Sequence, residues 1–361
     1  MPTLSESNRM IKWLALVATV ATFALLLNQL VTSDAKNDDV VLIHHEKKYP
    51  ITHYDSNHVV DLVARKKMWD TPLRDLIDLL DCLNPVSVSR VMQGGYDSHE
   101  RATLHYDGYR IPIAVHADEW ITKIIKGVTP GSTREEDIAR YFEINEVFKN
   151  QVKNKAPPGG NGAVVLDVGA NVGVFSLYAA ATGWPVISVE ASELNAKRLQ
   201  ESIGINNFDK VTLFRVAAGR ELKCAPMQIG WQKDNLGSNS LAISTDSNKD
   251  GVTQNTVMMP LEYLIDPTLD IAIFKLDVEG FECEALRGAH GLFKRKQVQL
   301  LFVEVNEPML KFGGCSKQEL KEILNDLCMD TADFDKQVGS TILGDFIGRP
   351  KASCHVQHKA P

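Results

Sequence analysis

Hydrophobic residues follow two different patterns along this chain. Near the N-terminus, an uninterrupted apolar or near-neutral run extends from Trp13 to Leu27 and continues to Val31. A helix of this length is what a bilayer crossing requires, so we expect a transmembrane signal anchor over residues 13–31. Farther along, short apolar runs alternate with segments of helical periodicity, which is typical of an α/β domain.

Charges are distributed unequally around the apolar run. Arg9 and Lys12 precede it, whereas the residues just after it are mainly acidic. The positive-inside rule therefore predicts that residues 1–12 form a cytosolic tail and that the rest is lumenal, as in a single-pass type II membrane protein of the ER or Golgi. Ser33-Asp34-Ala35 also fits a signal-peptidase site, and cleavage there would give a secreted protein. A buried helix of a soluble protein is the third possibility.

The next part of the chain has no recognisable catalytic motif. Residues 32–48 are polar and acidic and are expected to form a stem. Residues 49–156 mix helical periodicity with two β-like runs, Thr103 to Tyr109 and Ile111 to Val115, which predicts an α+β extension. A capping box at Thr133-x-x-Glu136 predicts a helix to about Val152, and the breaker at residues 157–160 predicts a domain boundary.

Regular alternation of strands and helices begins after this breaker and predicts a domain over residues 161–346, followed by a tail over 347–361. Such alternation favours an α/β fold with a doubly wound, mostly parallel sheet of the Rossmann-like type. Residues 223–260 are rich in Gly, Ser, Asn and Asp and are expected to hold one or two antiparallel strands. A second capping box, Ser316-x-x-Glu319, predicts another helix. The predicted strands are Ala163 to Asp167, Val186 to Glu190, Val211 to Ala217, Ile271 to Asp277 and Val298 to Val305, and the predicted helices are Val174 to Thr182, Glu193 to Ile203 and Glu282 to Arg295.

Composition narrows the possible partners. The chain has 361 residues, with 39 Lys and Arg against 46 Asp and Glu, so its formal net charge is −7. A protein with this balance and only short basic runs is not expected to bind duplex nucleic acid. None of the six cysteines forms a C-x-x-C pair, so we expect no zinc site, and the sequence leaves any disulfide pairing open.

The strongest motif runs from Val164 through Asp167-Val-Gly169-Ala-Asn171-Val-Gly173. A buried strand ends in an acid, the chain turns on glycines, and a helix follows at once, which lets a ligand approach the backbone. A dinucleotide site would need G-x-G-x-x-G, with glycine where Asn171 stands. A side chain there, together with a negative charge, suits a cationic, amino-acid-like ligand, so the motif favours S-adenosylmethionine over NAD. Glu190, at the end of the next strand, can accept both ribose hydroxyls.

A second motif, Lys275-Leu-Asp277-Val-Glu279-Gly280, follows the fourth strand of the predicted sheet. The carboxyl end of such a strand lies at the active edge of an open parallel sheet. If the strand stayed extended, alternation would place Asp277 and Glu279 on one side, where they could act on a proton. A helix N-terminus that simply carries favourable acids is the alternative.

Together these motifs resemble the FkbM-type S-adenosylmethionine-dependent methyltransferases, which have the class I methyltransferase fold. The resemblance covers about Ala163 to Val305 and also includes Met259-Pro-Leu-Glu-Tyr-Leu264, Leu286-Arg-Gly-Ala289 and Phe302-Val-Glu304. It implies S-adenosylmethionine as cofactor, bound by Asp167, Gly169, Asn171, Gly173, Glu190 and Ala217. On the substrate side it implies Lys275, Asp277, Glu279 and Glu304, with Asp277 or Glu304 as the base.

Members of that family mostly methylate oxygen, and many act on sugars. Combined with the predicted anchor, the resemblance implies a hydroxyl-bearing substrate, such as a glycan, and no catalytic metal. Three alternatives stay open from the sequence. They are an NAD-dependent oxidoreductase, a non-catalytic membrane-anchored binding protein, and a metal held by Asp277, Glu279 and Glu304.

Overall fold

The structure, a computed structural model, describes residues 100–106, 108–117, 119–126, 146–153, 163–229, 241, 252–295, 297–339 and 343–353. All of these belong to one compact unit. The predicted anchor, stem, Thr133 capping box and breaker at 157–160 lie outside the described residues. Among the helices that the structure does describe, none is both long enough and apolar enough to cross a membrane.

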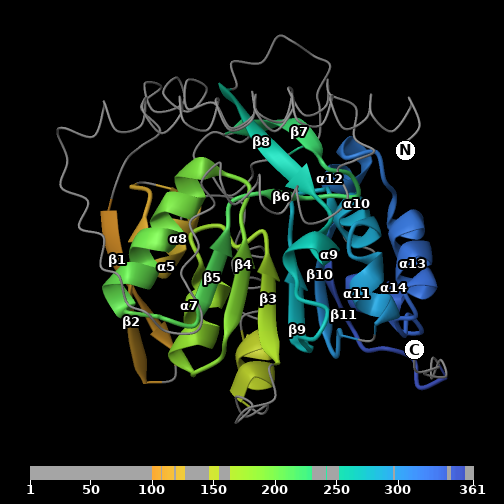
Figure 1. Ribbon diagram of the computed structural model, residues 1–361, viewed down its shortest axis with the longest axis horizontal. Coiled ribbons are helices and arrows are strands. Elements are labelled where there is room, and N and C mark those ends of the chain that lie inside the picture. Colours follow the sequence, from red (N-terminus) through yellow and green to blue (C-terminus); the bar gives the residue numbers. More distant parts are fainter. Residues whose placement is uncertain are drawn as a thin grey trace, which may run out of the picture. The chain divides into compact units, whose positions relative to one another are not determined.

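A six-stranded sheet forms the centre of the described fold, in the order β11-β10-β9-β3-β4-β5 (Figure 1). Neighbouring strands are parallel except for β11, which runs antiparallel to β10. Of the strands in this sheet, β3 comes first along the chain and lies in the middle of the sheet. The strand order therefore reverses between β3 and β9, as in other doubly wound sheets. The strands are β3 (Val164–Val168), β4 (Val186–Val189), β5 (Val211–Phe214), β9 (Ile271–Leu276), β10 (Leu301–Asn306) and β11 (Leu343–Gly348).

Strands β3 and β9 are buried along their whole length. Successive side chains of a strand point to opposite faces, and here they enter two separate apolar cores. Leu166 and Phe274 belong to the core on one face, whereas Val165 and Ile273 belong to the core on the other. Burial on both faces explains why these strands are continuous apolar runs in the sequence.

Helices cover the two faces of the sheet. The core that contains Leu166 also includes residues of α10, α11, α13 and α14, and the core that contains Val165 includes residues of α7 and α8. The helices are α7 (Val174–Ala181), α8 (Glu193–Asn206), α9 (Leu261–Leu264), α10 (Glu282–Arg287), α11 (His290–Lys294), α12 (Glu307–Phe312), α13 (Lys317–Asp326) and α14 (Phe334–Val338). The helix predicted to begin at Ser316 is present, since the Ser316 side chain accepts a hydrogen bond from Glu319 N and α13 follows, while the Glu319 carboxylate pairs with Arg287.

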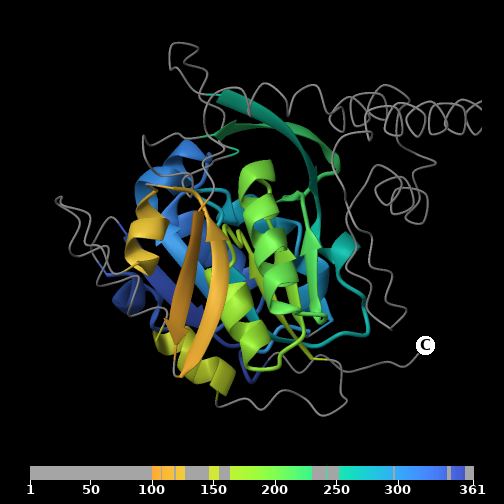
Figure 2. The same cartoon turned by 90° about the vertical axis from the view of Figure 1, so that its left-hand side faces the viewer.

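The described part of the N-terminal extension packs on the same face as α7 and α8. It consists of β1 (Glu100–Tyr106), β2 (Tyr109–Val115), the helix α5 (Trp120–Ile125) and helical residues 146–153. The strands β1 and β2 pair as an antiparallel hairpin, which lies beside α8 (Figure 2). Buried side chains of this segment, among them Ile113 and Phe148, complete the core under α7.

A small sheet of β6 (Ala217–Ala218), β7 (Lys223–Ile229) and β8 (Val252–Met259) accounts for the region in which antiparallel strands were expected. The prediction of one strand from Val211 to Ala217 was wrong. The chain leaves the main sheet after Phe214, and Ala217 pairs with Met258 of β8 instead. That pairing joins residues far apart in sequence, so the local pattern could not reveal it.

Two other predicted elements are shorter than expected. The helix from Glu282 to Arg295 is divided into α10 and α11, because Gly288 packs against the backbone of Gly219 and its carbonyl accepts a hydrogen bond from Glu262 N. The strand expected from Val298 begins only at Leu301, and Val298 makes a single bridge to Ile271.

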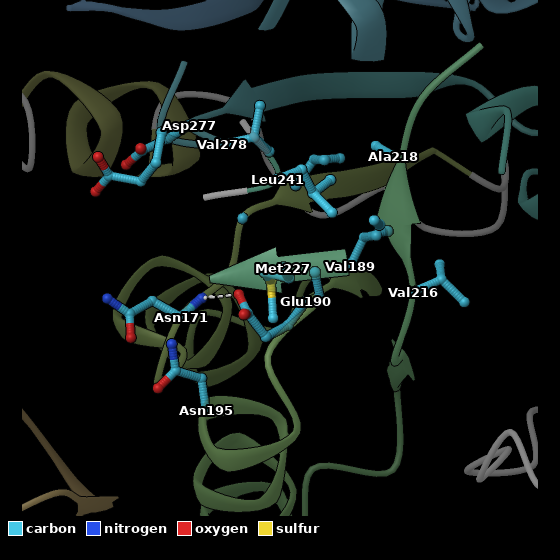
Figure 3. Close-up of a pocket in the computed structure, with 15 residues that line it drawn as sticks. Asn171, Val189, Glu190, Asn195, Val216, Ala218, Met227, Leu241, Asp277 and Val278 are labelled. Carbon is cyan, nitrogen blue, oxygen red and sulfur yellow. Dashed lines mark hydrogen bonds between the residues drawn. The ribbon is translucent and has the colours of Figure 1, made fainter. Parts of the chain in front are cut away.

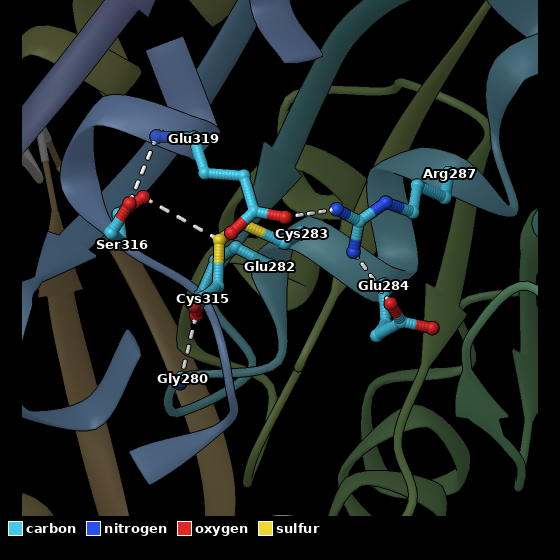
Figure 4. The surroundings of a disulfide bond; sticks show 8 residues. All are labelled: Gly280, Glu282, Cys283, Glu284, Arg287, Cys315, Ser316 and Glu319. Atoms are coloured by element: carbon cyan, nitrogen blue, oxygen red, sulfur yellow. Dashed lines mark hydrogen bonds and ion pairs between the residues drawn. A yellow bond between two sulfur atoms is a disulfide. The ribbon is translucent and has the colours of Figure 1, made fainter. Parts of the chain in front are cut away.

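A disulfide joins Cys283 in α10 to Cys315, which lies just before α13 (Figure 4). Beside it, Arg287 forms ion pairs with Glu284 and Glu319. Cys224 and Cys328 are disulfide-bonded as well, so all four cysteines in the described part of the chain are oxidised.

Candidate active site

The glycine turn after β3 has the backbone conformation that its sequence predicts. Gly169, Asn171 and Gly173 all have positive φ, at 79°, 53° and 97°. Gly169 also lies against the segment that follows β9, since a Cβ there would be 1.6 Å from the carbonyl oxygen of Asp277. At this position glycine is required both by the conformation and by the close approach of the two motifs. Gly173 immediately precedes α7 and packs against Leu199 of α8. It does not line the pocket described below.

Glu190 follows β4 and is only 7% exposed. Its Oε2 accepts a hydrogen bond from Asn171 N and its Oε1 accepts one from Ser192 N, both at 2.8 Å. Burial raises the pKa of Glu190 to about 7, although the two backbone hydrogen bonds act to lower it. The carboxyl group thus connects the glycine turn to the start of α8.

A pocket lies at the carboxyl ends of β3 and β4 (Figure 3). Asn171, Glu190 and Asn195 form a polar group on one side of it, and Asp277 and Glu279 add two carboxyl groups. The apolar lining residues include Val168, Val189, Val216, Met227, Leu241 and Val278, together with Ala217. Of the residues predicted to bind the cofactor, Gly169, Asn171, Glu190 and Ala217 are brought together here.

Asp167 does not line this pocket. It is fully buried, and its Oδ2 accepts a hydrogen bond of 2.6 Å from Ser176 Oγ. Its Oδ1 accepts no hydrogen bond from the described residues but lies 3.8 Å from Lys275 Nζ. Burial raises the pKa of Asp167, while Lys275 and Ser176 oppose this effect. The sequence placed its charge next to the ligand, whereas in the structure that charge faces a buried lysine beneath the turn.

Lys275 connects the two motifs below the pocket. Its Nζ donates a hydrogen bond of 3.1 Å to Asp277 Oδ2 and lies 4.6 Å from the centre of the Phe175 ring. Burial acts to lower the pKa of Lys275, but the carboxylates of Asp277 and Asp167 outweigh burial and raise it above its ordinary value. Lys275 therefore stays charged and holds one oxygen of Asp277, whose side chain is 33% exposed.

The segment after β9 turns sharply instead of staying extended. The strand ends at Leu276, and Glu279 has a φ of 53°, so the alternation expected for Asp277 and Glu279 is wrong even though both line the pocket. Glu282 holds this turn, because its Oε1 accepts hydrogen bonds from Val278 N at 3.0 Å and Gly280 N at 3.2 Å. Burial and the carboxylates of Asp277 and Glu282 raise the pKa of Glu279 well above its ordinary value.

Glu304, the other predicted base, is half-buried on β10, opposite Asp345 of β11. It does not line the pocket, and it contributes to the electrostatic environment of Lys275. Among the described residues, no three His, Cys, Asp or Glu side chains are grouped so that they could hold a metal ion.

Several lining residues were missed by the sequence analysis. Met227 and Leu241 come from the region that had no readable motif, and Asn195 lies in the first turn of α8. The only available signal for Asn195 was its position near the start of the helix that follows Glu190, since helix starts at this edge of a parallel sheet face the ligand site.

The arrangement suits S-adenosylmethionine. The apolar lining can hold a flat base, the buried carboxylate of Glu190 can accept the ribose hydroxyls, and the acidic end near Asp277 suits a positively charged methionine part. The Oδ1 of Asn171 is buried without a hydrogen-bond partner among the described residues.

Three crystal structures similar to the chain are of methyltransferases or of WbdD. Magnesium protoporphyrin IX methyltransferase from Synechocystis PCC 6803, with bound SAH, is 14% identical with a TM-score of 0.37, and the match covers 64% of this chain and 94% of that one. WbdD is 11% identical with a TM-score of 0.33, covering 58% and 40%. The tRNA (uracil-54, C5)-methyltransferase of Pyrococcus abyssi is 13% identical with a TM-score of 0.30, covering 59% and 36%.

No curated protein sequence matches the chain. The methyltransferase FkbM domain family, however, matches residues 167–335, which include the glycine turn, Glu190 and the Lys275 motif. This match favours a methyltransferase over the NAD-dependent oxidoreductase. Residues 167–335 thus match a methyltransferase FkbM domain, and the chain is an S-adenosylmethionine-dependent methyltransferase.

Proposed function

We propose that this enzyme methylates a hydroxyl group, with Asp277 as the base that receives the hydroxyl proton. The observation that carries this proposal is the position of Asp277, which lines the pocket while Lys275 holds one of its carboxylate oxygens at 3.1 Å. An alcohol has a high pKa, so its proton must leave as the new carbon–oxygen bond forms. A fixed, partly exposed carboxylate beside the pocket is suited to accept it.

The other residues of the pocket would bind the cofactor and orient the base. When bound, S-adenosylmethionine supplies a methyl carbon that is activated by its positively charged sulfur. Glu190, Asn171 and the backbone at Gly169 would hold the nucleoside and methionine parts, which fixes the position of the methyl group relative to the acceptor. Lys275 orients Asp277 so that its second oxygen can take the proton. Glu279, which has a raised pKa, lies next to this base and is assigned a supporting role.

The proposed acceptor is a glycan in the lumen of the ER or Golgi. Two observations support this compartment. The described cysteines Cys224, Cys283, Cys315 and Cys328 are all disulfide-bonded, which is characteristic of proteins that fold in an oxidising environment. The sequence also predicts a membrane anchor at residues 13–31 with the positive charges on its cytosolic side. Glycan hydroxyls are abundant acceptors in that compartment.

Incubation of the full chain with radiolabelled S-adenosylmethionine and a panel of glycans tests the activity. Base-stable label on a sugar hydroxyl is the expected result, and labelling of carboxyl or amine groups instead would overturn the proposal. Protease treatment of sealed microsomes tests the compartment. Residues after the predicted anchor should be protected until detergent is added, and their digestion in intact vesicles would contradict a lumenal location.

A further inference from the structure

We propose that Glu282 is a positioning residue for methyl transfer, because one oxygen of its buried carboxyl group fixes the turn that brings Asp277 and Glu279 to the pocket. The inference rests on the proposed role of Asp277 as the base. It assigns a part in the reaction to a side chain that does not itself line the pocket.

The contacts of Glu282 with this turn are buried (Figure 4). Glu282 is only 2% exposed. Its Oε1 accepts hydrogen bonds from Val278 N at 3.0 Å and from Gly280 N at 3.2 Å. Both hydrogen bonds to the turn therefore depend on a single oxygen atom.

The turn has a backbone conformation that needs such support. Glu279 has a φ of 53°, which lies in the left-handed region that is unfavourable for a residue with a side chain. The amide of Val278 belongs to the peptide group that follows Asp277, and the amide of Gly280 belongs to the one that follows Glu279. Since each peptide group is planar, a hydrogen bond to its N–H also sets the direction of its carbonyl. Glu282 thus fixes the peptide group after each of the two pocket carboxyl residues.

The two ends of the turn are held by other parts of the fold. Asp277 N donates a hydrogen bond of 3.0 Å to Val168 O at the end of β3. At the other end, Gly280 packs against α12, since a Cβ on Gly280 would lie 2.2 Å from Met309 O. Because both ends are anchored, a rotation of the peptide groups between them would move the side chains of Asp277 and Glu279 and leave the neighbouring strand in place.

The position of the Asp277 carboxylate matters for proton transfer. A base must lie within hydrogen-bond reach of the proton it accepts, and a misplacement of about 1 Å can lower the rate about a hundredfold. Lys275 Nζ holds one oxygen of Asp277 at 3.1 Å, but this contact does not define the backbone from which the side chain extends. Glu282 defines that backbone, so it acts on the reaction through Asp277 and Glu279.

Two substitutions of Glu282 separate the geometry of the turn from the negative charge at the start of α10. Glu282→Gln keeps a side-chain oxygen that can accept both hydrogen bonds, and its NH₂ group replaces Oε2, which has no hydrogen-bond partner among the described residues. Glu282→Asp keeps an acid in the first turn of α10, where it favours the helix, but it is one methylene shorter and cannot reach both amide groups. The first variant should therefore resemble the wild type, and the second should not.

Transfer of the radiolabelled methyl group from S-adenosylmethionine to the glycan that the wild-type protein labels best measures the effect. Glu282→Asp should lower kcat about ten- to a hundredfold, whereas Glu282→Gln should keep kcat within about threefold of the wild type. The Kd of S-adenosylhomocysteine should stay within about threefold in both variants, because Glu282 does not line the pocket. The double variant Glu282→Asp/Asp277→Asn should be within about threefold of Asp277→Asn in kcat, because the base that Glu282 positions is then already absent.

Gln297→Asn is the matched control, because Gln297 holds the turn at the opposite end of β9. Gln297 is 3% exposed, and its Nε2 donates hydrogen bonds to Asp266 O and Leu269 O. Shortening this side chain by one methylene should destabilise the protein much as Glu282→Asp does, while kcat stays within about twofold. Amide hydrogen exchange in a peptide that covers residues 276–281 should be faster in Glu282→Asp and unchanged in Gln297→Asn.

Several results would overturn the inference while leaving the proposed base intact. They are wild-type kcat or unchanged amide exchange in Glu282→Asp, equal losses of kcat in Glu282→Asp and Glu282→Gln, and an equal loss in Gln297→Asn. A Glu282→Asp protein that does not fold, beside a folded Gln297→Asn, would show that Glu282 serves the fold as a whole and would overturn it too. An Asp277→Asn variant with nearly full activity would instead contradict the proposed base, and the inference with it.

Discussion

Replacement of Asp277 by asparagine tests whether this carboxylate acts as the base, because the change removes the proton acceptor and leaves the surrounding residues in place. Asparagine keeps the size and shape of the side chain but cannot accept a proton at neutral pH. General-base catalysis contributes a factor of about 10²–10⁴, so Asp277→Asn should lower kcat at least about a hundredfold. Affinity for S-adenosylhomocysteine should stay within a few-fold, because the predicted ribose contact at Glu190 is untouched.

The cost in stability can be worked out from the contacts of Lys275. Breaking a fully buried ion pair costs about 3–5 kcal/mol, but the Asp277 side chain is 33% exposed, so part of its charge is already solvated. Lys275 also retains Asp167 at 3.8 Å and the Phe175 ring at 4.6 Å, and the amide oxygen of the replacement can still accept its hydrogen bond. We therefore expect a loss of about 1–2 kcal/mol in the free energy of unfolding.

Three measurements test the assignment of Asp277 as the base. They are kcat with a glycan shown to be an acceptor, the Kd of S-adenosylhomocysteine, and the free energy of unfolding from chemical denaturation. Glu304→Gln and Glu279→Gln serve as comparison variants. A larger loss of kcat in Glu304→Gln, with Asp277→Asn nearly active, would move the base to β10. A large loss only in Glu279→Gln would assign the proton to Glu279 and leave Asp277 a positioning residue.

Other predictions concern the cofactor pocket and its stability. Glu190→Ala should weaken binding of S-adenosylhomocysteine by about 1.5–3 kcal/mol, measured by calorimetry, and unchanged affinity would contradict the ribose assignment. Gly169→Ala should destabilise the protein by about 2–4 kcal/mol, because the new Cβ would clash with the carbonyl oxygen of Asp277. Gly204→Ala in α8, where a Cβ would have no neighbour within 4 Å, should stabilise the protein by about 0.5–1 kcal/mol. The buried carboxyl groups of Glu190 and Glu282 have pKa values raised to about 7. The folded state therefore binds more protons than the unfolded state between about pH 4.5 and 7. Without ligand, the free energy of unfolding should fall as the pH rises through this range. Denaturation at pH 5 and pH 8 checks this, with a smaller difference expected for Glu282→Gln, and a rise in stability over that range would refute it.

Much of the sheet could be predicted from the sequence. Strands β3, β4 and β9 are buried on both faces, so each is a continuous apolar run that stands out in the sequence, and their ends differ from the predicted ends by one residue. The glycine turn could also be predicted, because a positive φ depends mainly on the residue at that position, and glycine adopts it readily. These features depend on local conformation and on burial, which periodicity reports directly.

Other features were decided by the tertiary structure. Asp167 does not line the pocket, because its carboxyl group is directed toward Ser176 and Lys275, which come from other elements. The Oδ1 of Asn195 lies 3.1 Å from Nε2 of His116, which is 79 residues away in sequence. A hydrogen-bonding side chain can turn toward any partner within reach, and the partner is chosen by how the elements pack. The sequence by itself therefore determined which strand ends border the pocket, while the packing of α8, β2 and α7 against the sheet decided which side chains line it.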